Sequence, residues 1–456
     1  MPVATKSRGL NGGSLPIRNR HSEFDDRDAP EPPVFSLARI LLVATLFGAP
    51  LAFGAVVPWA WGALGLLACL ELIMWAFGSV QRGSLRLIWS PLYIPLALFL
   101  LLGVVQYTAG LTLEGPETRQ ALVLLAVDLA FFFLALHLFA GAGSQALPAF
   151  GLAVLVYGGL LGLFTILQFV SGTHRIYGIV DTPRDALFGP YVNRDHYAGL
   201  MEMLIPVAIL SVAGRRTRGS WGAKALCVFA VTLTVASLLL SGSRAGLLAL
   251  SAAIAVAAIV LRGTVAQTKG GRRLALSAAG VLAAGVILFA YLDPGGIARR
   301  LGSVADVNAA RAEWAGRRKL MAFDTLRMWR DHPGLGVGMG AFEIAYPHYQ
   351  SFPSDDWIDH AHNDYIEALA ETGLVGALLI LWALALFFRE AFRDWEQSSR
   401  PQASWIRLAA AIGCFGILVH SLWDFNLHIP ANAAWFAVLA GITTTSPDSS
   451  AIDDQY

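Results

Sequence analysis

The feature that most constrains this chain is a series of apolar segments, each about as long as a membrane-spanning helix. A helix needs about 20 apolar residues to cross the hydrocarbon core of a bilayer. The sequence predicts an all-α polytopic membrane protein with about twelve transmembrane helices, at residues 35–55, 59–79, 89–108, 120–140, 148–170, 196–213, 224–241, 245–262, 273–292, 365–388, 404–423 and 429–445. Prolines within these segments are expected to kink them, at Pro50, Pro95 and Pro206.

The composition excludes a soluble protein. Hydrophobic residues make up 56% of the chain and charged residues 14%, whereas a soluble domain carries about 25% charged residues. A net charge of +1 with scattered basic residues gives no indication of a nucleic-acid partner. Each of the three cysteines lies inside an apolar run, so neither a disulfide framework nor a CxxC metal motif is predicted.

Charge predicts how the helices are oriented. Residues 1–33 are polar, basic and rich in proline, which is typical of a disordered tail. Further basic residues fall in alternate loops, and lysine and arginine mark the cytoplasmic side. The tail 1–33 and the C-terminal tail 446–456 are therefore predicted to be cytoplasmic, on either side of a transmembrane domain at 34–445. Two long loops, 171–195 and 293–364, fall on the opposite side.

The cytoplasmic loops are too short to hold a nucleotide-binding domain, and the chain contains no P-loop motif. These observations argue against an ATP-driven pump. They also argue against an enzyme that uses nucleotide sugars inside the cell.

The large loop 293–364 contains two recognisable parts. Cations alternate with apolar residues over Gly316–Asp331, which predicts an amphipathic helix at the membrane interface. The segment GLGVGMG follows at residues 334–340. Backbone amides of such a turn can bind phosphate, but a flexible re-entrant turn is an equal alternative, because no strand precedes it as in the dinucleotide fingerprint.

A dense polar stretch, WIDHAHNDYIEALAETGLVG at 357–376, closes the loop and enters an apolar segment. Asp364, Glu367 and Glu371 are spaced three and four residues apart, so they share one helix face. Such a face should look into the protein or a wet cavity. Asp364 or Glu367 could orient His362 or bind sugar hydroxyls. Alternatively, these carboxylates serve only to stabilise the helix, because negative charge is favourable near the positive N-terminal end of the helix dipole.

Five segments together resemble the O-antigen ligase and polysaccharide polymerase superfamily of bacterial envelope membrane proteins. The matching segments are YVNRDHYAGLMEMLIP at 191–206, LSGSRAGLLAL at 240–250, GRRKLMAFDTLRMWRDHPGLGVGMGAF at 316–342, HAHNDYIEALAETGLVG at 360–376 and HSLWDFNLHIPANA at 420–433. They occur in the expected order, with a large outer loop before the histidine motif. The first five predicted transmembrane segments, residues 35–170, resemble the family only in being apolar.

The resemblance implies a metal-independent glycosyltransferase of the bacterial inner membrane, with no cofactor and an active site facing the periplasm. Such proteins take a glycan from an undecaprenyl diphosphate carrier. Ligases pass it to a lipid A core sugar, and polymerases pass it to a second lipid-linked glycan. The ligase signature, a histidine and a glycine separated by ten residues, fits His362 and Gly373. The functional arginines of the family fall on Arg244 and on Arg317, with Arg318 adjacent.

The chemistry of these residue types agrees with such a role. A diphosphate leaving group gains negative charge as the glycosidic bond breaks, and guanidinium groups bind phosphate oxygens in bidentate fashion. An arginine that only snorkels to lipid phosphate is the alternative for Arg244. Imidazole titrates near neutral pH, so His362 could act as a general base on the acceptor hydroxyl. Alternatively, it only caps the helix that begins at Asn363.

Other polar residues are assigned around this centre. His360 is a weaker candidate, and His360 with His362 and Asp359 gives poor support for a metal site. His420 and Asp424 are interpreted as a structural polar pair. The predicted site contains catalytic His362, Arg244 and Arg317, and substrate-binding Arg318, His360, Asn363, Asp364, Glu367, Asn193, Arg194 and His196, with no metal.

Two other classes of membrane protein share some of these features. A transporter of lipid-linked glycans would also have twelve helices and arginines in a cavity, but it would more often show internal repeats, and none is recognisable here. A cell-wall glycan polymerase of the shape, elongation and division type also has a large outer loop. Its motifs are not found in this sequence.

Overall fold

The structure is a computed structural model that describes residues 31–140, 142, 145–173, 175–181, 188–214, 221–267, 269–293, 309–354, 357–393 and 401–445. Most of the predicted N-terminal tail, residues 294–308 of the large loop and the predicted C-terminal tail lie outside the described residues. The rest of the predicted transmembrane domain can be compared with the structure directly.

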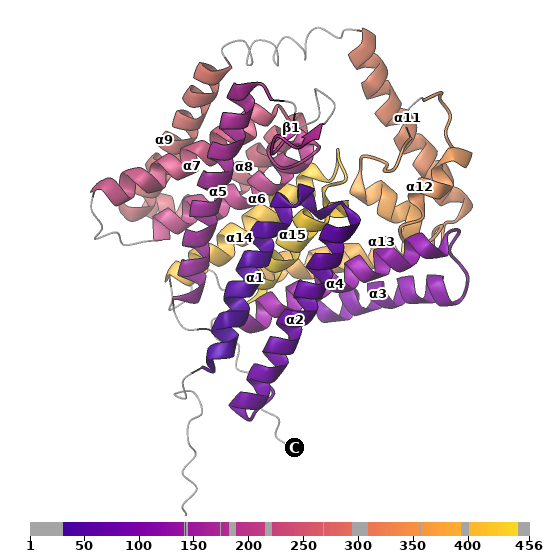
Figure 1. Cartoon of the computed structure of the whole chain (residues 1–456), viewed down its shortest axis with the longest axis horizontal. Helices are drawn as coiled ribbons and strands as arrows, with labels where there is room; N and C mark the ends of the chain where they lie inside the picture. Colours follow the sequence, from indigo (N-terminus) through magenta and orange to yellow (C-terminus); the bar gives the residue numbers. More distant parts are fainter. Residues whose placement is uncertain are drawn as a thin grey trace, which may run out of the picture. The chain divides into compact units, whose positions relative to one another are not determined.

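The described chain is almost entirely helical, and this confirms the all-α membrane fold (Figure 1). Each of the twelve predicted segments coincides with one helix. These helices are α1 Pro33–Leu51, α2 Pro58–Arg82, α3 Tyr93–Thr108, α4 Gly115–Ala140, α5 Ala146–Ser171, α6 Arg194–Gly214, α7 Trp221–Ser241, α8 Arg244–Gln267, α9 Lys269–Leu292, α13 Asp364–Phe392, α14 Pro401–His420 and α15 Pro430–Thr444.

Nine of these helices, counted over the described residues, are long and apolar enough to cross a membrane. The exceptions are α3, with 16 residues, α15, with 15 residues, and α9, which is apolar only over Ala278–Leu292. A helix shorter than the hydrocarbon core can still span a bilayer, because the bilayer thins locally and flanking residues snorkel to the interface.

Two helices form the centre of the bundle. Of the apolar, membrane-length stretch of each helix, 83% is buried inside the protein in α6 and 78% in α14. In α2 and α13 the buried share is only 28%. Small residues let the central pair approach closely: a Cβ added at Gly413 of α14 would lie 2.7 Å from the carbonyl oxygen of Met203 in α6. A small residue at such a position lets the backbones of two membrane helices approach closely. Helices α6 and α14 therefore provide a rigid support for side chains at their ends.

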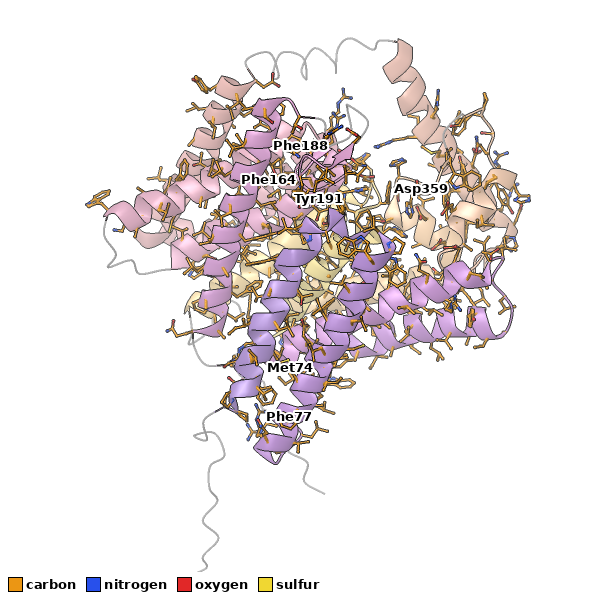
Figure 2. All side chains as sticks on the ribbon, in the orientation of Figure 1. Met74, Phe77, Phe164, Phe188, Tyr191 and Asp359 are labelled. Carbon is orange, nitrogen blue, oxygen red and sulfur yellow. The ribbon has the colours of Figure 1, made fainter. Side chains whose placement is uncertain are left out.

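The two long loops meet at one end of the bundle. Phe188 and Tyr191, from the first loop, and Asp359, from the second, lie far from Phe77 near the end of α2 (Figure 2). The first loop contains a short hairpin, β1 Arg175–Ile176 and β2 Val180–Asp181. This arrangement agrees with the prediction that both loops face the same side of the membrane.

The second loop has a small core of its own. Helix α11 Ala309–Asp331 contains the predicted amphipathic segment, and α12 Phe342–Ala345 and the 3-10 turn η2 Tyr346–His348 follow it. Met328 is buried among Phe342 and Tyr346, while Phe323 on α11 is 66% exposed. The loop is therefore a folded unit that packs on α13.

Helix α13 is broken at Gly373, and the glycine-rich segment fills the break. Gly373 has φ 64° and ψ −166°, outside the helical region. The amides of Val337 and Gly338 donate to the carbonyls of Ala370 and Glu371, and the amides of Leu374 and Val375 donate to Pro333 and Gly334. The segment 333–338 thus supplies the hydrogen bonds that the helix loses at the break.

These contacts decide between the two predictions for GLGVGMG. The amides of Gly336, Val337, Gly338 and Met339 all donate to protein oxygens, the last to Gln106 Oε1. A phosphate cradle is therefore wrong, because the amides are already used. The kink in this helix arises at a glycine rather than at a proline.

Candidate functional site

The polar stretch before α13 holds His362 in an unusual backbone conformation. His362 has φ 50°, in the left-handed region that non-glycine residues seldom adopt. The helix is capped by the next residue, because Asn363 Oδ1 accepts hydrogen bonds from the amides of Tyr365 and Ile366. The alternative that His362 itself caps α13 is wrong. Strained backbone of this kind is common at functional sites.

His362 is paired with Asp424 from the turn that follows α14. Its Nδ1 donates to Asp424 Oδ1 at 3.2 Å, and the carboxylate is 1% exposed while the imidazole is 24% exposed. Asp424 therefore contacts His362 and also lies 4.0 Å from His420, the residue with which it was predicted to form a structural polar pair. A carboxylate on Nδ1 fixes the ring tautomer and leaves Nε2 as the basic nitrogen.

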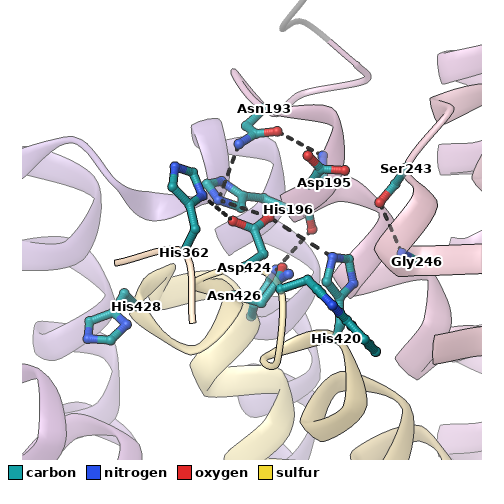
Figure 3. Close-up of polar contacts among 12 residues, drawn as sticks. Asn193, Asp195, His196, Ser243, Gly246, His362, His420, Asp424, Asn426 and His428 are labelled. Carbon is teal, nitrogen blue, oxygen red and sulfur yellow. Dashed lines mark hydrogen bonds and ion pairs between the residues drawn. The ribbon is translucent and has the colours of Figure 1, made fainter. Parts of the chain in front are cut away.

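Residues at the start of α6 lie close to Asp424 (Figure 3). His196 Nε2 lies 4.0 Å from Asp424 Oδ2, and Asn193 Nδ2 lies 3.5 Å from His196 Nε2. Arg318 Nη1 donates to the carbonyl of Trp423, next to Asp424. The predicted residues Asn193, His196 and Arg318 are thus brought together with His362. Ligand atoms of Asp195 and His420 also lie within 4.8 Å of those of Asp424, and His420 in turn contacts Glu202. We call His362, Asp424, His196, His420, Glu202 and Asp195 the His362 cluster.

The electrostatics of the cluster keep Asp424 ionised. Burial alone would raise the pKa of the Asp424 carboxyl, but the hydrogen bond from His362 and the nearby charges of His196 and His420 outweigh it and hold the pKa well below its usual range. Burial lowers the pKa of Arg318, while the charges of Asp424 and Asp195 oppose that shift. Asp424 therefore provides a fixed negative charge behind His362.

Arg244 begins α8 beside the same end of the bundle. Ser243 Oγ accepts from the amide of Gly246 and so caps the helix. A Cβ added at Gly246 would lie 2.7 Å from the Cβ of Ala198, so α8 approaches α6 closely at this point. Arg244 is exposed at the helix N-terminus, where the helix dipole also favours an anion. Arg194 and Arg317 lie in α6 and α11.

A second group of polar residues surrounds His360 and is kept separate from the first. His360 Nδ1 is 2.7 Å from Glu367 Oε1, and His428 Nδ1 is 2.8 Å from Asp364 Oδ1. Glu367 Oε2 also accepts from the amide of Ala361. Asp364 and Glu367 therefore orient His428 and His360 and not His362, which corrects one of the predicted alternatives. We call His360, Glu367, His428 and Asp364 the His360 cluster.

The shared face of α13 points inward, as predicted. Asp364, Glu367 and Glu371 are all less than 10% exposed. Glu371 has a structural role, because its Oε1 accepts from the amide of Phe342 and ties the second loop to the helix. One aromatic ring separates the two clusters: Phe425 lies 4.2 Å from His360, 5.1 Å from His362 and 4.7 Å from His196 between ring centroids.

The ligand types in both clusters are those that bind metals. Ligand atoms of His360, Glu367 and His428 lie within 4.8 Å of one another, as do those of Asp195, His420 and Asp424. In the His360 cluster, however, two imidazoles face two carboxylates, so the groups can neutralise one another as ion pairs. Burial alone would lower the pKa of His428, but Glu367 and Asp364 raise it to about 10. The imidazolium form of His428 satisfies these carboxylates.

This pKa gives a prediction for stability. A histidine with its pKa raised on folding stabilises the protein fully below about pH 6.5, and this contribution is lost as pH rises toward 10. We expect the melting temperature of the detergent-solubilised protein to fall between about pH 6.5 and 9.5. His428→Gln should flatten this slope, whereas His348→Gln, at an exposed position, should leave it unchanged. If the melting temperature fell equally steeply with pH in wild type and in His428→Gln, His428 would not be the imidazolium that stabilises the fold.

An apolar cavity of about 410 Å³ lies between the helices next to the His360 cluster. It is lined by α2, α3, α4, α13 and α15, mainly through leucine, alanine and phenylalanine side chains. Polar groups line it at Asp128, Asp364, Glu371 and His428. The cavity therefore joins an apolar space to the polar end of α13.

Sequence reasoning missed several residues of these clusters. Asp424 and His428 belong to the segment HSLWDFNLHIPANA, which carries the resemblance but was assigned no chemical role. Glu202 lies in the middle of an apolar segment, and an ionisable residue at such a depth is itself a signal of function. That signal could have identified Glu202 from the sequence.

The fold and the polar clusters define a polytopic membrane protein with a titratable site at one end of its helix bundle. Comparison with known families then gives a match: residues 228–381 match the family described as O-antigen ligase. This confirms the resemblance to the ligase and polymerase superfamily, over a region that includes Arg244, Arg318, His362 and Gly373. The segments at 191–206 and 420–433 lie outside the matched region. A search of curated proteins gives no match to the chain.

Proposed function

We propose that this protein is a metal-independent glycosyltransferase of the O-antigen ligase type, which moves a glycan from undecaprenyl diphosphate to a lipid A core sugar on the periplasmic face of the inner membrane. The observation that carries the proposal is the His362–Asp424 pair, next to Arg318 and at the loop end of the bundle. The family match over residues 228–381 supports the class of reaction.

The pair has the geometry of a general base. Asp424 holds Nδ1 of His362, so Nε2 takes the proton from the acceptor hydroxyl as its oxygen bonds to the anomeric carbon of the glycan. The bond from that carbon to the diphosphate oxygen breaks, and the carrier diphosphate leaves with the electron pair. The Asp424 carboxylate stabilises the imidazolium formed in this step.

Arginines then balance the charge of the leaving group. Arg244 at the N-terminus of α8 and Arg317 and Arg318 on α11 provide guanidinium groups that fit phosphate oxygens. Arg318 is placed beside Asp424 through Trp423, so a diphosphate bound there would lie near the reacting carbon. Asn193, Arg194 and the His360 cluster would contact sugar hydroxyls.

The apolar cavity suits a hydrocarbon chain. Its lining is mainly aliphatic and aromatic, and it ends at Asp364, Glu371 and His428. We assign it to part of the isoprenoid chain of the donor, with the glycan toward the polar end. A chain bound inside the bundle would hold the diphosphate at a fixed depth in the membrane.

The spacing of His362 and Gly373 favours a ligase over a polymerase, which would use a second lipid-linked glycan as its acceptor. A transporter would need no general base, so the His362–Asp424 pair argues against that class. Membrane lipids surround the bundle, and no nucleic acid takes part in the proposed reaction.

Replacement of Arg244 tests the role of the guanidinium. We expect Arg244→Ala to lower glycan transfer roughly 100-fold, the usual effect of losing one charge-stabilising donor. Arg244→Lys should recover part of the activity, because lysine keeps the charge but loses bidentate binding. Arg175→Ala, on the exposed hairpin, is the matched control and should transfer at the wild-type rate. Full activity of Arg244→Ala in membranes with equal amounts of protein would exclude this role.

A further inference from the structure

The contacts behind Asp424 include a buried pair that the proposed reaction does not use directly. His420, the last residue of α14, places Nδ1 3.1 Å and 3.2 Å from the two carboxylate oxygens of Glu202 in α6. Both side chains are fully buried. A carboxylate at this depth requires a partner, because an isolated buried charge is very costly. The pair therefore links the two central helices at the base of the site.

The other face of the His420 ring looks toward Asp424. His420 Nε2 lies 4.0 Å from Asp424 Oδ2, and neither atom has a hydrogen-bond partner among the described residues. This distance is too long for a hydrogen bond, so a proton cannot pass directly between them. Two opposite charges at 4.0 Å in a buried site still interact strongly. The coupling is therefore electrostatic.

Each ring nitrogen of His420 thus faces a carboxylate. Only the imidazolium form presents an N–H group to both sides, since a neutral ring would turn one lone pair toward an anion. We propose that Glu202 and His420 form a buried carboxylate–imidazolium pair that positions Asp424, and through it His362. Glu202 and Asp424 together keep the charge on His420, and His420 attracts Asp424 Oδ2 while Oδ1 accepts from His362. Without Glu202, Asp424 is the remaining anion that keeps His420 charged.

The proposal makes Glu202 and His420 positioning residues of the His362 site. It rests on the proposed function for its relevance to transfer, but its test needs no transfer. Diethyl pyrocarbonate modifies neutral imidazole, and the His362 side chain is 24% exposed. Peptide mass spectrometry gives the rate of modification at His362 at each pH. The pH at which this rate reaches half its maximum reports how the surrounding charges affect the His362 ring.

The expected signs follow from the charges. Glu202→Gln removes a negative charge, and His420 then competes with His362 for Asp424, so the midpoint of modification should move to lower pH by about half a unit or more. Glu202→Gln combined with His420→Gln removes both charges and should return the midpoint close to wild type. The other titratable or charged groups near Asp424 stay the same in every variant: Asp195, His196 and Arg318.

A matched control is available in α2. Glu71 is also a fully buried carboxylate, and it accepts a hydrogen bond from Thr45. Glu71→Gln makes the same chemical change in a different helix and should leave the midpoint at His362 unchanged. If Glu202→Gln gives the same midpoint as wild type and Glu71→Gln, the positioning role is overturned.

A second measurement compares the wild-type protein with His420→Gln, so it does not depend on folding of the Glu202 variant. Nitrogen-15 spectra of histidine-labelled protein at about pH 8 should contain, besides the imidazolium signal of His428, an imidazolium signal that His420→Gln removes. Loss of a neutral imidazole signal instead would overturn the pair. If both tests succeed and glycan transfer fails, the pair stands and the proposed function does not.

Discussion

Cells that carry His362→Ala or Asp424→Asn in place of the wild-type protein should lose glycan transfer while the protein still accumulates in the membrane. His362 would be the base that takes the acceptor proton, and losing such a group costs roughly 10²–10⁴-fold in rate. Asp424→Asn keeps the shape of the side chain but removes the charge that stabilises the imidazolium. The measurement is transfer in isolated membranes, normalised to the amount of protein by immunoblot.

Two controls match these changes. His348→Ala alters an exposed histidine of the same loop, and Asp181→Asn alters an exposed aspartate of the hairpin. Both should transfer at the wild-type rate. Wild-type transfer by His362→Ala would show that the histidine of the signature is not the base.

The second large effect concerns the fold and not the chemistry. Gly373 combines a positive φ with a backbone contact, because a Cβ at this position would overlap the carbonyl of Gly334. We expect Gly373→Ala to destabilise the protein by about 3 kcal/mol or more, since strain and overlap add. The protein should accumulate poorly, and its melting temperature in detergent should fall well below wild type.

Gly62 of α2 provides the control for this substitution. It lies within a helix, and nothing lies within 4 Å of a Cβ added there. Gly62→Ala should leave stability unchanged or raise it by up to about 1 kcal/mol, as expected for alanine in a helix. Equal accumulation of Gly373→Ala and Gly62→Ala would show that the break in α13 tolerates a side chain.

The fold could be predicted because hydropathy dominates it. A segment of about 20 apolar residues must form a helix in lipid, and each predicted segment is a helix in the structure. The break at Gly373 could not be predicted, because it depends on hydrogen bonds from residues 333–338. Pro50, Pro95 and Pro206 were the expected kinks, but local sequence does not show where a distant loop inserts.

The site could be predicted only in part. The resemblance singled out His362, Arg244 and the residues at the start of α6 as candidates, because its motifs can be recognised in the sequence alone. It did not pair His362 with Asp424, because that contact joins two segments 62 residues apart. Charge spacing on α13 suggested Asp364 or Glu367 as the partner of His362, yet the left-handed turn at His362 directs its ring away from them and toward the end of α14.

The most direct measurement uses cells that lack this protein, complemented with wild type or with His362→Ala. Their lipopolysaccharide would be separated on a gel, their secreted polysaccharide assayed and their carrier-linked glycan extracted. For a ligase, the whole ladder should be absent and long carrier-linked glycan should accumulate, and only the wild-type protein should reverse both effects. Single repeats on the core, or loss of the secreted polymer alone, would indicate a polymerase instead. Normal glycans in all three assays would contradict the proposed function.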